Sequence, residues 1–207
     1  MRRLAGLALT LALTLALTLA LTLALTTEEA CAHPPFAGAT GFYGGLLHPL
    51  LVPTHAIAVL SLGLLIGQQK PHWRWPMALS YAAGLGIGFA AMISAFAPRF
   101  STEALLAAVA IDGALVALAR VLPWLTVCIL ALAVGITLAL DSSPGGISVR
   151  EANVILLGTF CGAVILLWAI LEGVAIFRRE WQKLGVRILG SWIAASAVLV
   201  LTWQLAK

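Results

Sequence analysis

Apolar runs of membrane-spanning length recur along this chain, and they constrain its fold more than any other feature. Of the 207 residues, 62% are hydrophobic and only 10% are charged. A helix of about 20 apolar residues is long enough to cross the hydrocarbon core of a bilayer. The sequence therefore predicts an all-α protein, a polytopic membrane helix bundle whose surroundings are the lipid bilayer.

The N-terminus is organised like a targeting segment. Met1-Arg2-Arg3 is basic, and residues 7–26 are five copies of Leu-Ala-Leu-Thr. A polar stretch and then Ala30-Cys31-Ala32 follow, and Ala-x-Ala fits the small-residue rule for signal peptidase cleavage. We therefore expect a signal peptide over residues 1–32 and a mature chain that begins at His33. The apolar run is longer than usual for a signal peptide, so an uncleaved anchor is the alternative.

The remaining chain, residues 33–207, is expected to form one transmembrane domain. Its apolar segments are separated by stretches rich in proline, glycine and charge. Six segments lie near residues 40–67, 76–97, 103–121, 124–140, 152–177 and 186–205. The sequence thus predicts six transmembrane helices after the signal peptide.

The distribution of basic residues predicts the orientation of these helices. With the mature N-terminus outside, the inner side holds seven Lys or Arg residues: Lys70, Arg74, Arg120, Arg178, Arg179, Lys183 and Arg187. The outer side holds three: Arg99, Arg150 and Lys207. This excess obeys the positive-inside rule. Five tryptophans lie near predicted helix ends, as interfacial anchors do: Trp73, Trp75, Trp124, Trp181 and Trp203.

Small residues spaced four apart indicate where helices come close together. Three such pairs are Gly41/Gly45, Gly84/Gly88 and Gly158/Gly162. Glycine at this spacing lets two helix backbones approach closely in a membrane. We expect contacts within one chain, with a homo-oligomer contact as the alternative.

The first segment contains two histidines, His48 and His55, which are the first candidates for function. Imidazole is a preferred ligand for nickel, copper, zinc and iron, and it is costly in hydrocarbon unless it faces protein or a polar cavity. On a regular helix the two would lie about 10 Å apart, too far to share one ion. Pro49 and Pro53 interrupt the helical hydrogen bonds here. The histidines are therefore either successive stations along a path or are brought closer by a kink, unless they only fix packing.

Three further residues are candidates for a metal path. Asp112 lies near the middle of the third segment, where a lone carboxylate needs a partner, a proton or a cation. His33 would present an α-amine and an imidazole if the signal peptide is cleaved. Glu172 is a weaker candidate, because Arg178 and Arg179 follow it and offer a salt bridge on the inner side.

Several function classes find no support. The formal net charge of +4 comes from residues scattered over short loops, so we expect no nucleic-acid partner. The sequence contains no His-Glu-x-x-His, Cys-x-x-Cys, P-loop or Gly-x-Ser-x-Gly motif. We therefore expect neither an enzyme nor a permanently bound cofactor.

The start of the mature chain carries a family resemblance. Ala32-His33-Pro34 is followed by Gly41-Phe42-x-x-Gly45-x-x-His48-Pro49 and, after five residues, by His55. This order resembles the HupE/UreJ family of hydrogenase and urease accessory membrane proteins. The resemblance implies a six-helix bacterial inner-membrane protein that transports Ni²⁺ or Co²⁺.

The chain departs from the family pattern at the residues presumed to bind metal. The family motif reads His-Pro-x-x-Gly-x-Asp-His, whereas Val52 and Thr54 occupy the Gly and Asp positions here. The family also has a histidine-rich motif on its fourth helix, and residues 133–141 contain no histidine. Only His48 and His55 carry over, which makes the chain a divergent member.

The leading hypothesis is a secondary transporter, a permease for nickel or cobalt, with His33, His48, His55 and Asp112 along the path. The alternative is a non-transporting membrane accessory protein for metalloenzyme assembly, in which the histidines hold the structure or bind a partner. A carrier for an organic solute, or one coupled to protons through Asp112, has no supporting motif.

Overall fold

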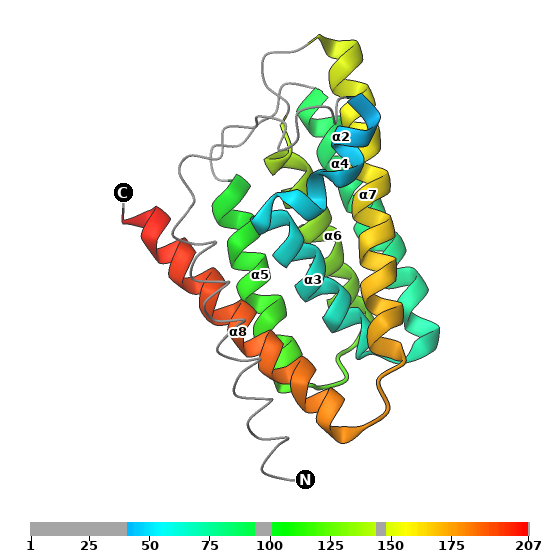
Figure 1. The fold of residues 1–207 in the computed structure, drawn as a ribbon, viewed down its shortest axis with the longest axis vertical. Coiled ribbons are helices and arrows are strands. Elements are labelled where there is room, and N and C mark those ends of the chain that lie inside the picture. Colours follow the sequence, from blue (N-terminus) through cyan, green and yellow to red (C-terminus); the bar gives the residue numbers. More distant parts are fainter. Residues whose placement is uncertain (1–40, 94–100, 144–147, 207) are drawn as a thin grey trace. The chain divides into compact units, whose positions relative to one another are not determined.

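The computed structural model describes residues 41–93, 101–143 and 148–206 of the chain. The expected signal peptide and His33 lie outside these ranges. In the described part the structure is helical, with no strand. The elements in chain order are α2 (Gly41–Leu51), α3 (Pro53–Gly67), a 3-10 turn (Pro71–Trp73), α4 (Arg74–Ile93), α5 (Ser101–Leu118), α6 (Trp124–Asp141), α7 (Val149–Ala175) and α8 (Glu180–Leu205) (Figure 1).

The helices agree with a membrane helix bundle. Within the described ranges, five helical stretches are each long and apolar enough to cross a membrane, and the bent pair α2 and α3 supplies a sixth when it is counted as one span. The six predicted segments correspond to these spans with ends that differ by a few residues. The principal difference is in the first segment, which is two helices rather than one.

Two prolines explain the break between α2 and α3, which are bent by 68° relative to each other. Val52, between the helices, has an extended backbone with φ −87° and ψ 113°. A residue that precedes proline is pushed away from the helical region, and Pro53 follows Val52 directly. Pro53 then suits the first position of α3, where a helix needs no N–H donor. Pro49 removes one further donor from the last turn of α2.

Helix α3 lies at the centre of the bundle. Its neighbours include α5 and α7, and Figure 1 shows it between those two helices. The last ten residues of α3, 58–67, are apolar except for Ser61, and all of them except Leu60 are buried. A helix that is apolar on every side can lie among other helices or face lipid. The central place of α3 therefore follows from its contacts with the neighbouring helices rather than from hydrophobicity alone.

The predicted glycine pairs lie at helix contacts within the chain. Helix α2 packs on α7, and Gly45 faces the backbone of Ile155 so closely that a Cβ there would overlap the Ile155 carbonyl. Gly158 and Gly162 face α2 in the same way, against the carbonyls of Phe42 and Leu46. Gly84 and Gly88 face α6 from α4: a Cβ on either would overlap α6 atoms, including the carbonyls of Leu132 and Ile136. These contacts confirm the prediction of packing within one chain.

Seven of the eight Lys and Arg residues in the described ranges lie at one end of the bundle, which we call the basic end. The connections α3–α4, α5–α6 and α7–α8 all lie there (Figure 1). The seven residues predicted for the inner loops belong to these connections or to the adjoining helix turns. Among the tryptophans, Trp75, Trp124, Trp181 and Trp203 are exposed near helix ends, as interfacial anchors should be.

Replacing Gly158 by leucine should destabilise the protein by separating α2 from α7. Overpacking of a tight contact costs about 1–3 kcal/mol, and here the obstacle is backbone that cannot rotate away. We expect a lower midpoint of thermal unfolding in detergent, followed by tryptophan fluorescence.

Gly86→Leu is the matched control for this change. Gly86 is exposed on α4, and a Cβ there would meet nothing within 4 Å. If both variants unfold at the same temperature, the close approach of α2 and α7 does not limit stability.

Candidate functional site

The break in the first span brings His48 and His55 together. Their ring centroids are 5.0 Å apart, and the ring planes meet at 65°. A regular helix would hold the two residues about 10 Å apart along its axis. Of the two arrangements left open by the sequence, the structure has the one in which the kink brings the histidines closer.

A carboxylate from another helix holds His55 in place. The His55 Nε2 atom lies 3.0 Å from Asp141 Oδ2, and His55 is buried. Ser101 donates a hydrogen bond of 3.3 Å to the other carboxylate oxygen, and Thr102 donates to that same oxygen. Asp141 is thus bound by the first turn of α5 and by the start of α3.

The electrostatics of Asp141 depend on this set of donors. Asp141 is the last residue of α6, where the helix dipole is negative and disfavours an anion. Ser101 and Thr102 open α5, whose N-terminal dipole favours an anion. Neighbouring helix ends of opposite polarity therefore meet at this carboxylate, which offsets the unfavourable end of its own helix.

Each histidine has one buried nitrogen with no hydrogen-bond partner among the described residues. These atoms are Nε2 of His48 and Nδ1 of His55. When an imidazole donates from Nε2 to a carboxylate, its Nδ1 keeps a free lone pair. A histidine that binds a metal usually donates its other N–H to a carboxylate or carbonyl in this way. His55 and Asp141 have the arrangement of such a pair.

The two histidines do not complete a closed metal site. In the ranges that the structure describes, no group of three or more His, Cys, Asp or Glu side chains is placed to hold one metal ion. Asp141 approaches the nitrogen of His55 that faces away from the free Nδ1. The arrangement therefore offers two nitrogen donors, with the carboxylate as support for one of them.

The other predicted residues are not joined to this cluster. Asp112 is fully buried in α5, and neither of its carboxylate oxygens has a hydrogen-bond partner among the described residues. The sequence left the partner of Asp112 open, and the carboxylate bound to His55 is that of Asp141. Glu172 is exposed on α7 and makes no ion pair within the described part of the chain. His33 lies outside the described residues.

The sequence did not indicate Asp141 as a site residue, because it is the first residue after the fourth predicted segment, 124–140. Alternation of six spans places the end of the fourth segment and the start of the third on the same side as the start of the first. A search for acidic residues at those ends would have found Asp141. Its contact with His55 in particular depends on the 68° bend.

A comparison with models of protein families shows which family the chain belongs to. The sequence model described as HupE / UreJ protein matches residues 19–200. Neither the comparison with curated proteins nor that with solved structures gives a match. Because the family match covers most of the chain, the protein belongs to the HupE/UreJ family.

Asp141→Ala should destabilise the protein, because it leaves a buried imidazole N–H and two hydroxyl groups without their acceptor. A buried polar group that loses its partner costs about 1–3 kcal/mol. Asp141→Asn keeps one acceptor oxygen and should have a smaller effect. Both would be measured as the midpoint of thermal unfolding in detergent.

Glu172→Gln provides the control, since this carboxylate is exposed and makes no ion pair in the described ranges. A midpoint for Asp141→Ala equal to that of Glu172→Gln would show that the bonds to Asp141 contribute no stability.

Proposed function

We propose that this member of the HupE/UreJ family is a secondary transporter, a permease for a divalent transition-metal cation in the bacterial cytoplasmic membrane. Nickel or cobalt is the proposed cargo, because membership of the HupE/UreJ family suggests a membrane protein related to nickel or cobalt. The observation that carries the proposal is the approach of His48 and His55 at the break in the first span.

Two imidazole nitrogens suit a cation that passes through rather than one that stays. Nickel and cobalt bind imidazole well, and both free nitrogens belong to rings that are close together. Conduction requires binding strong enough to enter and weak enough to leave. A full cage of three or four ligands would hold the ion, whereas the pair formed by His48 and His55 can release it.

The orientation supports uptake into the cell. The basic end fits the cytoplasmic side by the positive-inside rule, which would place the start of α5 and the end of α6, and the histidines beside them, toward the outside. A membrane potential that is negative inside favours inward movement of a cation by about 2.3 kcal/mol per charge per 100 mV. Cleavage after Ala32 would add the α-amine and imidazole of His33 at the outer surface.

Asp112 is the proposed second station. A buried carboxylate with no partner must hold a proton or a cation, because a bare charge inside protein is very costly. Asp112 lies near the middle of α5, whereas the histidine cluster contacts the first turn of that helix. Asp112 is therefore deeper in the span than the histidines. A cation that leaves the histidines could exchange with the proton on Asp112.

One observation favours the accessory role instead. The described residues do not form a site with three metal ligands. The histidines would then fix the bend between α2 and α3 for a partner in metalloenzyme assembly. Transport assays distinguish the two functions.

Replacing His48 and His55 together by alanine should reduce nickel or cobalt uptake to background. The assay uses radiolabelled ions and cells that lack their own permeases, at equal membrane expression of each variant. His72→Ala is the matched control, because His72 is an exposed histidine in the 3-10 turn at the basic end. Uptake that persists in the double variant would reject the histidine path, and a wild type without uptake would favour the accessory role.

Asp112→Asn should abolish uptake while the protein still folds. Asparagine has nearly the same shape but cannot exchange a proton or balance a cation. Folding would be checked by gel filtration in detergent and by thermal unfolding. Wild-type uptake by a folded Asp112→Asn variant would assign this residue a purely structural role.

A further inference from the structure

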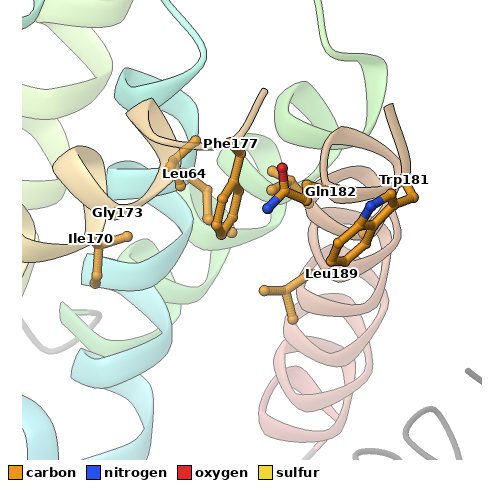
Figure 2. A pocket seen from close by; sticks show the side chains of 10 residues that line it. Leu64, Ile170, Gly173, Phe177, Trp181, Gln182 and Leu189 are labelled. Carbon is orange, nitrogen blue, oxygen red and sulfur yellow. The ribbon is translucent and has the colours of Figure 1, made fainter. Parts of the chain in front are cut away.

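A groove lies between α7 and α8 at the basic end, away from the histidines. Its volume is about 430 Å³, and its lining is mainly apolar. Figure 2 shows Leu64 and Ile170 on one side, Leu189 and Trp181 on the other, and Phe177 between them. The two helices follow each other in the chain but pack on different partners, α7 on α2 and α8 on α5, which leaves this space between them.

A smaller and more polar pocket continues the groove at the helix ends. Its volume is about 260 Å³, and Val174, Phe177 and Val186 line both spaces. Arg74 and Lys183 are the cationic residues of its lining. Apolar groove and cationic pocket are thus contiguous, with the charge at the end of the bundle where lipid headgroups would lie.

Arg74 and Gln68 in the lining of this pocket each have one polar atom without a hydrogen-bond partner among the described residues. Arg74 donates from Nη2 to the Gly67 carbonyl at 2.8 Å, but its buried Nε has no partner among the described residues. Gln68 donates to the Val116 carbonyl, while its buried Oε1 has no donor in the described ranges. Both atoms are covered by protein, so what the pocket offers a headgroup is the positive charge of Arg74 and Lys183.

The shape of the groove depends on two missing side chains. Gly173 of α7 and Gly185 of α8 both line it, and a Cβ on either would meet nothing within 4 Å. Most glycines of the bundle, such as Gly158, instead lie against a neighbouring backbone. Glycine inside a helix is less favourable than alanine, and at these two positions helix packing gives no reason for it.

We propose that groove and pocket together bind one anionic phospholipid of the phosphatidylglycerol type. One acyl chain lies in the groove along α7 and α8, and the phosphate lies at Arg74 and Lys183. Basic pockets between membrane helices on the cytoplasmic side are suited to anionic headgroups. Phosphatidylethanolamine fits less well, because its ammonium group would lie among cations.

The test measures lipid binding by the full chain, purified in detergent and stripped of lipid, using native mass spectrometry. We expect one phosphatidylglycerol per protein, bound about tenfold more tightly than phosphatidylethanolamine, which corresponds to about 1.4 kcal/mol. Gly173→Leu with Gly185→Leu fills the groove and should weaken binding of phosphatidylglycerol by about the same factor. Lys183→Gln should narrow the preference for the anionic lipid.

Gly86→Leu is the control, because it adds the same side chain at an open glycine outside the groove. It should bind phosphatidylglycerol as the wild type does. Gel filtration confirms that each variant is folded. Lys183 is exposed and its ion-pair partner in the described ranges is Glu180, so Lys183→Gln should leave the fold intact. Equal binding of the two lipids by the wild type, or unchanged binding by the filled groove, would overturn the proposal.

Discussion

The bend at Val52 determines where the candidate site lies. An extended residue before Pro53 ends α2 and starts α3 in a new direction, and His48 and His55 stand on opposite sides of that turn. Broken helices leave backbone groups that lipid cannot satisfy, so they occur only where protein or a cavity surrounds them. Helix α2 packs closely on α7 just before the break, at Gly45 and Leu46. The break is therefore partly covered, with Val52 half-buried and Pro53 exposed, and of the two imidazoles His55 is buried and His48 half-buried.

Asp141 shows how the bundle accommodates a charge at an unfavourable position. The end of α6 repels an anion, but the start of α5 provides two hydroxyl donors and the start of α3 provides an imidazole. Asp112 lies on α5 and has no hydrogen-bond donor among the described residues, so its environment differs from that of Asp141.

Much of the fold follows from local sequence, but the site follows only in part. The six spans, the basic end and the glycine contacts were predictable, because apolar length, loop charge and small-residue spacing act over short stretches. Pro49 and Pro53 indicated a kink but not its angle. The bond between His55 and Asp141 joins residues 86 apart in sequence and depends on how α3, α5 and α6 pack. The groove could not be predicted from the sequence either, because it arises where α7 and α8 separate.

The pairing of α2 with α7 has a consequence for biosynthesis. Helices emerge into the membrane in chain order, yet α2 finds its closest neighbour only after about a hundred further residues have been made. Until α7 has been made, Gly45 of α2 and the break that follows this helix lack the contacts that α7 provides. The region around His48 is therefore among the last parts of the molecule to mature, and a chain stalled before α7 would insert its early spans without assembling that region.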